Sequence, residues 1–321
     1  MNQKKPRVAI YYNNKIRNDG PPLYYFNVLK RQLGLDTIHL LPEGDTRSYG
    51  KFDLHFWVDF GEDSFLSPEA CEWMPPKDEG KTIYVCSDAH LGPEYRFKKA
   101  RQFDYVFFNQ ERAAKEYMAE EVIAKRVGPS KSNQKVAWLP HAAEPQAYPH
   151  FETLKKYDVA FIGHIQEQPN FNGITRVELL DRAFKEFPNF FFGTRQPAFP
   201  GKNMFEDASK RFCESKVVLN ISIGDDLNMR LFEILSSGAF QLTNWLPTME
   251  EIGLKDGVHL ATYKTLDEMV EKARYYIEHE EEREKIAQAG HEAFLSGHTY
   301  KHRILQILKT VGFPLEEGGE Q

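Results

Sequence analysis

The sequence predicts an α/β protein with two open parallel sheets, each covered by helices, and further helices at the C-terminus. Two observations predict this class. Short β-branched and aromatic runs alternate with longer helical patterns along the chain, as in sheets built from strand–helix–strand units. In addition, a chain of 321 residues is longer than one hydrophobic core ordinarily accommodates, which favours two domains of about 150 residues each.

The first half of the chain predicts six strands. Each is a short apolar run that polar residues or glycine follow, and the runs span 7–12, 37–41, 53–60, 82–86, 103–109 and 135–139. Helical patterns lie between them, at 22–34, 94–101 and 112–126. The turn-rich segment 13–22 follows the first strand, so we expect it to lie where open sheets carry their active-site loops.

A proline-rich stretch separates the two halves. Residues 140–156 carry three prolines and no sustained periodicity, so we place the boundary at about residue 152. The predicted domains are therefore 1–152 and 153–321. In the second, strands are expected at 158–163, 190–193, 217–223, 239–243 and 258–263, and helices close the chain near 266–277, 282–294 and 300–311.

Segment 216–245 is the most informative part of the sequence. A strand-like run ends at Gly224, and an amphipathic helix begins at Asn228 and stops at Gly238. Ligands bind beyond the C-terminal ends of strands in such sheets, and helix N-termini favour anions.

Arg230 and Glu233 lie three residues apart on the first turns of this helix, so both can face one crevice. A cation for a diphosphate and a carboxylate for ribose hydroxyls suit a sugar nucleotide, and we expect both side chains to face solvent in an open cleft. The spacing alone leaves a second interpretation open, an ordinary surface ion pair.

The same segment resembles a family of glycosyltransferases. Asp225 and Glu233, with seven residues between them and ILSSGAFQLT after them, resemble the E-x7-E region of nucleotide-sugar glycosyltransferases with the GT-B fold. The pattern N-M-R-x-F-E-x-x-x-x-G-A-F is similar to that of the CgeB-like branch, and the residues that match it are Asn228, Met229, Arg230, Phe232, Glu233, Gly238, Ala239 and Phe240. The phrases YVCSDAHL, FDYVFFNQ, VAWLPHAAEPQAY and GHTYKHRILQIL extend the likeness over about residues 7–308.

This resemblance implies two Rossmann-like domains that face a cleft. It implies an enzyme that moves a hexosyl or pentosyl group from a nucleoside-diphosphate sugar to a hydroxyl-bearing acceptor, without a metal or a cofactor. The acceptor stays open between a glycan, a small molecule, a protein and a nucleic acid. Two alternatives also stay open: a phage-type enzyme that glycosylates DNA bases, and a non-catalytic sugar-binding or structural relative.

The resemblance also assigns residues to the donor side. Glu233 matches the carboxylate that holds the ribose, and Asp225, one methylene shorter than glutamate, matches the catalytic carboxylate near the donor sugar. Relatives often carry an arginine and a lysine after the first strand of the second domain, where this chain reads GHIQ at 163–166. We therefore expect Arg230 to carry most of the phosphate charge. The further donor-binding candidates are Asn228, Met229, Gly163, His164 and Arg195, whereas Arg176 is expected on the surface.

The first domain is expected to supply the acceptor side. Asp88 and His90 follow a strand and could form an oriented carboxylate–imidazole pair, with His90 as the catalytic base. A capping aspartate beside an ordinary loop histidine is the alternative. Asn18, Asp19 and Gly20 in the first loop are candidates for holding acceptor or phosphate through backbone amides.

Composition narrows the function classes. A net charge of −6 does not indicate a polyanion-binding protein. Cys71, Cys86 and Cys213 are too widely spaced for a disulfide framework or a zinc pattern. The N-terminus lacks a signal-peptide core, and no apolar run approaches the roughly 18 residues of a membrane span. We therefore expect a cytoplasmic protein.

Overall fold

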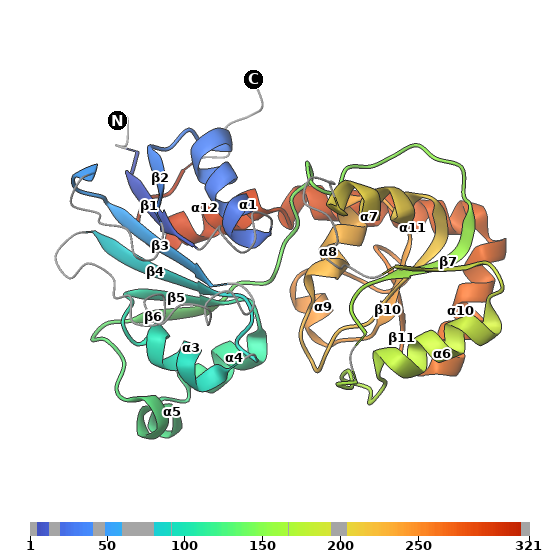
Figure 1. Ribbon diagram of the computed structural model, residues 1–321, viewed down its shortest axis with the longest axis horizontal. Helices are drawn as coiled ribbons and strands as arrows, with labels where there is room; N and C mark the ends of the chain where they lie inside the picture. Colours follow the sequence, from blue (N-terminus) through green and yellow to red (C-terminus); the bar gives the residue numbers. More distant parts are fainter. Residues whose placement is uncertain are drawn as a thin grey trace. The chain divides into compact units, whose positions relative to one another are not determined.

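The computed structural model describes residues 5–12, 20–40, 49–59, 80–90, 92–165, 167–193 and 204–315. The chain forms two compact units (Figure 1). Unit 1 comprises residues 1–140 and 300–321, and unit 2 comprises residues 141–299. Each unit contains one parallel sheet with helices on both faces, which confirms the predicted α/β class with two tandem sheets.

The described residues of unit 1 form six parallel strands in the order β2-β1-β3-β4-β5-β6. Their bounds are β1 Val8–Tyr11, β2 Thr37–Leu40, β3 Leu54–Asp59, β4 Lys81–Cys86, β5 Tyr105–Phe108 and β6 Lys135–Trp138. Side chains of β3 and β4 are buried on both faces, as their continuous apolar sequences predict. The strand order reverses between β1 and β3.

Helices cover both faces of the unit 1 sheet (Figure 1). On one face, α1 (Pro21–Asn27) continues as a π-helical turn, η1 (Val28–Gln32), and both pack on α12 (Tyr300–Thr310). The rings of Tyr24 and Tyr25 lie 5.2 and 5.5 Å from that of Tyr300. The other face is covered by α3 (Pro93–Ala100) and α4 (Glu111–Met118), which α5 (Glu120–Val127) follows.

Unit 2 contains a smaller sheet. Five strands of its described part are parallel, in the order β11-β10-β9-β7-β8. They span β7 Tyr157–Ile162, β8 Phe190–Gly193, β9 Ser215–Asn220, β10 Gln241–Asn244 and β11 Ala261–Tyr263. Here β9 ends three residues earlier than the sequence predicts, because Ile221 begins the loop into the next helix. The strand order of this sheet reverses between β7 and β9.

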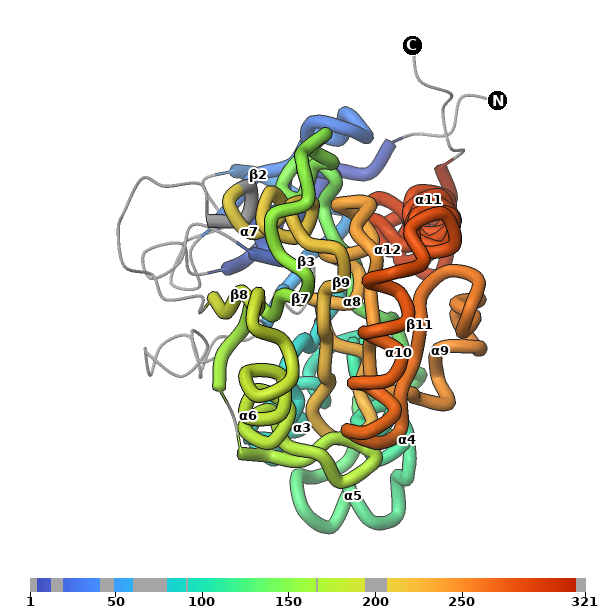
Figure 2. Tube along the Cα trace, turned by 90° about the vertical axis from the view of Figure 1, so that its right-hand side faces the viewer, coloured from blue at the N-terminus to red at the C-terminus, as the bar shows by residue number. Residues whose placement is uncertain are grey.

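Two layers of helices enclose the unit 2 sheet. On one face, α6 (Arg176–Glu186) and α10 (Leu266–Glu278) lie side by side and bury the main hydrophobic cluster (Figure 2). On the other face lie α7 (Met204–Cys213) and α8 (Met229–Ser236), and α11 (Glu280–Gly297) packs on α8. The short helix α9 (Thr248–Glu251) follows β10. None of the helices described in either unit is long and apolar enough to cross a membrane.

The compact units divide the chain at Pro140 and not at the expected residue 152. The reason is that the proline-rich stretch is packed on unit 2: Ser236 Oγ donates to the Tyr148 carbonyl at 3.0 Å, and His150 Nδ1 donates to the Ser237 carbonyl at 2.9 Å. The last helix, expected in the second domain, belongs to unit 1, where Arg303 Nε donates to the Pro140 carbonyl at 2.8 Å.

Candidate functional site

The most favourable place for a ligand in unit 2 is the point between β7 and β9 where the strand order reverses. Two loops leave the sheet there, described at residues 163–165 and 167–175 after β7 and at residues 221–228 after β9. They are in direct contact, since the Gly224 amide donates to the Pro169 carbonyl at 3.0 Å. The loops, together with the N-terminus of α8, form what we call the switch-point site.

Asn228 and Met229 begin α8 at this site. Asn228 is the N-cap: its Oδ1 accepts from the Leu231 amide at 3.0 Å, and its Nδ2 donates to the Ile221 carbonyl at 3.1 Å. Met229 is the first helical residue and is half-buried. The side chain of Asn228 therefore fixes the helix start and the loop after β9.

Arg230 lies directly on the backbone of Gly163. A Cβ atom at Gly163 would stand 2.6 Å from Cζ and from both terminal nitrogens of Arg230, so only glycine leaves room for the guanidinium. The same guanidinium lies 5.3 Å from the centre of the Phe161 ring. Arg230 is only 7% exposed. This burial rules out an exposed surface pair and also corrects the expectation that Arg230 faces open solvent.

A second arginine, Arg176, supports the same two loops. Arg176 Nη1 donates to the His164 carbonyl at 3.0 Å, and its Nη2 donates to the Ile221 carbonyl at 3.3 Å. Its side chain is buried, which corrects the expectation of a surface residue. Burial lowers the pKa of Arg176 to about 10, so the side chain is still a cation near pH 7. Two buried guanidinium groups thus flank residues 163 and 164.

Glu233 lies one turn further along α8 and is completely buried. The Tyr148 hydroxyl donates to Glu233 Oε1 at 2.8 Å. Removing a carboxylate from water is costly unless its oxygens accept hydrogen bonds, which explains the buried tyrosine opposite it. The expectation that Glu233 faces solvent is therefore wrong.

The remaining donor-side candidates are less closely defined. Asp225 lies in the loop between β9 and α8 and is half-buried, beside the loop contact at Gly224. His164 is exposed, and its carbonyl is the group that Arg176 holds. Arg195 lies outside the described residues.

Gly163→Ala gives a specific test of the switch-point site. Gly163 has a backbone conformation that any residue adopts, so the added methyl group displaces the end of the Arg230 side chain and leaves the fold intact. If Arg230 binds a phosphate, the affinity for a nucleoside diphosphate measured by calorimetry falls about tenfold or more, because a hydrogen bond to a charged group contributes roughly 1.5 kcal/mol or more.

The matched control for this variant is Gly297→Ala in α11, where an added Cβ meets no atom within 4 Å. Combining Gly163→Ala with Arg230→Ala should cost no more affinity than Arg230→Ala alone, because both remove one interaction. Additive losses would contradict the assigned contact.

On the acceptor side, unit 1 pairs His90 with a residue that the sequence did not indicate. His90 follows β4 and is exposed, and its Nδ1 lies 2.6 Å from Nε2 of Gln110. Gln110 is the N-cap residue of α4 but makes no capping hydrogen bond with its side chain. The hydrogen bond that holds the imidazole therefore comes from Gln110 and not from Asp88, which corrects the predicted pair.

Asp88 lies near a buried ion pair. Arg96 Nε stands 3.0 Å from Asp59 Oδ2, with both side chains fully buried, and the Tyr84 hydroxyl donates to the same oxygen at 2.5 Å. Burial lowers the pKa of Arg96, but nearby negative charges, first Asp59 and with a smaller effect Asp88, raise it above its ordinary value. Asp88 thus belongs to the electrostatic surroundings of Arg96.

The first loop of unit 1 is described only at its end. Gly20 is buried, has a φ of 105°, and its carbonyl accepts from the amides of Leu23 and Tyr24 at the start of α1. A positive φ suits glycine at this position. Asn18 and Asp19 lie outside the described residues.

Part of the chain matches a family model, and its fold is similar to that of several solved structures. Residues 176–309, which include α8 and the loop before it, match a family model described as glycosyl transferase-like. No curated protein sequence matches the chain. Among solved structures, an alpha-glucosyltransferase in complex with UDP-glucose and DNA containing an abasic site has 10% identity and a TM-score of 0.65, over 96% of this chain and 100% of that one.

Two further structures are similar over nearly their whole length. Sucrose-phosphate synthase from Thermosynechococcus elongatus has 8% identity and a TM-score of 0.62, over 95% of this chain and 98% of that one. HepE from Anabaena in complex with UDP and glucose has 10% identity and a TM-score of 0.59, over 95% and 99%. The fold is of the GT-B type. At such low identity, the likeness establishes the GT-B fold alone.

Three residues of this GT-B chain were missed or misplaced by the sequence reasoning. Gln110 and Tyr148 make their contacts across 20 and 85 positions. Both end phrases that resemble the CgeB-like family, FDYVFFNQ and VAWLPHAAEPQAY, but the phrases alone assign them no partner. Arg176 could have been noticed, because it opens a helix directly after a strand and its loop. Among the parts of the chain that are described, no group of three or more His, Cys, Asp or Glu side chains could hold a metal ion.

Proposed function

We propose that the protein is a glycosyltransferase that moves a sugar from a nucleoside diphosphate to a hydroxyl-bearing acceptor. One observation carries the proposal: the buried Arg230 guanidinium lies on Gly163 at the switch point, beside the N-terminus of α8. A diphosphate finds there a cation, backbone N–H groups and the positive end of a helix. The family-model match over 176–309 includes this helix and supports the same function.

The donor roles follow from this position. Arg230 binds the diphosphate, with Gly163 leaving room for the guanidinium and Arg176 holding the two loops. Glu233 is the ribose contact and must take another rotamer to reach the ligand, since the Tyr148 hydroxyl holds it in a buried position. His164 and Arg195 assist at the phosphates, Asn228 and Met229 position the helix, and Asp225 lies near the transferred sugar.

Catalysis in this proposal rests on positioning the donor and stabilising the departing diphosphate. Arg230, assisted by Arg176, supplies positive charge at the phosphates, so the reaction needs no divalent cation and no cofactor beyond the nucleotide sugar. Unit 1 provides the acceptor side through His90 and Asp88, with Asn18, Asp19 and Gly20 in the first loop. The resemblance to CgeB-like enzymes supports this assignment, and the acceptor is a glycan, a small molecule, a protein or a nucleic acid. The three widely spaced cysteines support a place in the reducing cytoplasm.

Calorimetry with UDP, UDP-glucose, UDP-N-acetylglucosamine, GDP-mannose and ADP-glucose tests the donor side. We expect at least one nucleotide to bind, and a thermal shift to accompany it, because ligand at about 100 times its Kd stabilises the folded state by about 2.7 kcal/mol. Binding should weaken in Arg230→Ala. Absence of binding for every nucleotide would overturn the function.

Assays with the nucleotide sugar that binds then distinguish the proposed enzyme from the two alternative functions. Release of free sugar from the donor, measured without acceptor, identifies an enzyme, whereas binding without any release or transfer identifies a non-catalytic relative. Duplex DNA with hydroxymethylated bases, offered beside oligosaccharide acceptors, tests the DNA-modifying alternative. The net charge of −6 favours the non-nucleic-acid acceptors.

A further inference from the structure

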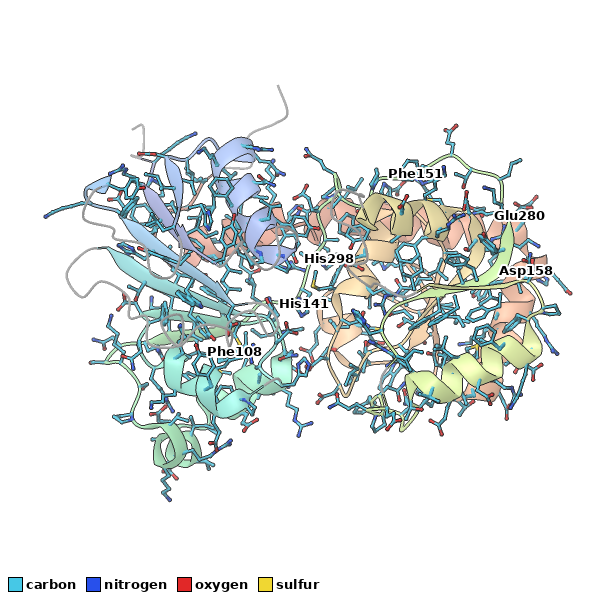
Figure 3. The ribbon with its side chains drawn as sticks, viewed as in Figure 1. Phe108, His141, Phe151, Asp158, Glu280 and His298 are labelled. Atoms are coloured by element: carbon cyan, nitrogen blue, oxygen red, sulfur yellow. The ribbon has the colours of Figure 1, made fainter. Side chains whose placement is uncertain are left out.

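The contact between Gln110 and His90 defines the chemistry of His90 more closely than the proposed function does. Gln110 lies two residues beyond the end of β5, which Phe108 marks in Figure 3. Its side chain is 5% exposed, whereas His90 is exposed. The amide nitrogen Nε2 of Gln110 lies 2.6 Å from Nδ1 of His90, a short hydrogen bond. A buried amide therefore holds an accessible imidazole.

The segment that carries Gln110 is fixed by its neighbours. Asn109 Nδ2 donates to the Leu139 carbonyl at 2.6 Å, and Trp138 Nε1 donates to the Asn109 carbonyl at 3.2 Å. Both hydrogen bonds involve Asn109, the residue before Gln110, and they join the end of β5 to the end of β6. The amide thus approaches His90 from a rigid position, as a positioning group must.

The orientation of the amide follows from burial. Gln110 Oε1 is buried and has no hydrogen-bond partner among the described residues. Turning the amide by 180° would place the NH₂ group, with two N–H donors, in that same position without a partner. A buried unsatisfied donor is costly and rare, and an under-satisfied carbonyl is less so. The orientation in which Nε2 faces His90 is therefore the more stable one.

This orientation determines the tautomer of His90. An amide NH₂ group can only donate, so Nδ1 of His90 must accept through its lone pair. A neutral imidazole that accepts at Nδ1 carries its proton at Nε2. The nitrogen left for a ligand then has an N–H group and no free lone pair.

We propose that Gln110 is a positioning residue that holds His90 as the Nε2–H tautomer, so that His90 donates a hydrogen bond to a ligand oxygen and is not a general base. The assignment of a ligand to His90 rests on the proposed function. A base would need a lone pair at Nε2, which a carboxylate at Nδ1 would create and an amide N–H does not.

The chain contains an internal reference for the opposite tautomer. His150 Nδ1 and His291 Nδ1 contact the carbonyl oxygens of Ser237 and Leu235, at 2.9 and 3.0 Å. A carbonyl can only accept, so both imidazoles carry their proton at Nδ1. His90 should therefore differ from His150 and His291 in one spectrum of the same protein.

Long-range ¹H–¹⁵N correlation spectra of the full chain with ¹⁵N-labelled histidine test the tautomer. At about pH 8.5, two units above the ordinary imidazole pKa of about 6.5, all ordinary imidazoles are neutral. The His90 signals are those that disappear in His90→Gln. We expect His90 to give the Nε2–H pattern, and His150 and His291 to give the Nδ1–H pattern. An Nδ1–H pattern for His90 would overturn the proposal without any assay of activity.

Gln110→Glu reverses the chemistry at the same position. A carboxylate can only accept, so His90 must carry its proton at Nδ1 and expose the Nε2 lone pair, while His150 and His291 remain unchanged. A folded variant in which His90 keeps the Nε2–H pattern would refute the role of Gln110. Gln110→Met provides a second measurement that introduces no buried charge, and it should move His90 toward the mixture of tautomers that an unheld imidazole shows.

Turnover then separates a donor from a base, because the two roles predict opposite signs. If His90 donates, Gln110→Glu lowers kcat about tenfold, since one hydrogen bond in the transition state is lost. If His90 is a base, the carboxylate preserves or raises kcat, and that result would overturn the proposal. A chain that binds no nucleotide sugar would refute the proposed function, while the spectra would still decide the tautomer.

Discussion

Replacing Arg230 with alanine is expected to weaken the binding of the nucleoside diphosphate by roughly 10- to 100-fold, because a hydrogen bond to a charged group contributes about 1.5 to 3 kcal/mol. The guanidinium is the cation that lies on the Gly163 backbone at the switch point. Isothermal titration calorimetry of both proteins with the same nucleotide measures the loss directly.

Two controls keep this result interpretable. Arg274→Ala removes an arginine of the same unit that is exposed and pairs with Glu186, so its affinity for nucleotide should not change. Arg230→Lys keeps the charge but loses the paired N–H groups of the guanidinium, so it should recover only part of the affinity. If Arg230→Ala keeps its thermal stability and binds the nucleotide as tightly as the original protein, the diphosphate does not bind at the switch-point site.

The order of strands and helices could be predicted from the sequence because it depends on local pattern. Most strands of the two sheets contain a short apolar run, and the parallel arrangement buries β3 and β4 on both faces, as their continuous apolar sequences predict. The position of the domain boundary could not be predicted in this way. Three prolines in 140–156 indicated a linker, yet hydrogen bonds from Ser236 and His150 pack this stretch on unit 2.

The candidate site shows the same division between local and distant information. That Arg230 stands at the start of a helix after a strand follows from spacing, and the structure places it there. That Glu233 is buried under a tyrosine 85 residues away does not follow from any pattern in the sequence. Likewise, Arg176 looks like a surface residue of an amphipathic helix until its carbonyl partners after β7 and β9 are known.

The pairing at His90 illustrates why residue type near a strand end is insufficient to assign a role. Asp88 lies two positions before His90 in the sequence and suggests a carboxylate partner. The residue that contacts the imidazole is Gln110, which follows β5, the strand next to β4 in the sheet. An aspartate and a glutamine at Nδ1 have opposite effects on the imidazole. The aspartate carboxylate accepts a hydrogen bond from Nδ1–H, whereas the glutamine amide donates a hydrogen bond to the lone pair of Nδ1.

Replacing His90 with alanine is expected to lower kcat about 100-fold and to leave the affinity for the nucleoside diphosphate unchanged, because the proposed diphosphate site lies in unit 2 and His90 lies in unit 1. Steady-state kinetics of sugar transfer measure kcat, and calorimetry on the same preparation measures the affinity for the nucleoside diphosphate. His279→Ala, which removes an exposed histidine at the end of α10, is the matched control and should keep normal turnover.

His90→Gln decides which role the lost group has. Glutamine can donate an N–H to a ligand oxygen but cannot take a proton at neutral pH. If His90 is a donor, His90→Gln should therefore retain about tenfold more turnover than His90→Ala, because one neutral hydrogen bond contributes about 1 kcal/mol. If the imidazole acts as a base, both variants should be equally slow. Near-normal turnover in both would instead assign His90 to the structure of the loop after β4, since neither its N–H nor its lone pair would then matter to the reaction.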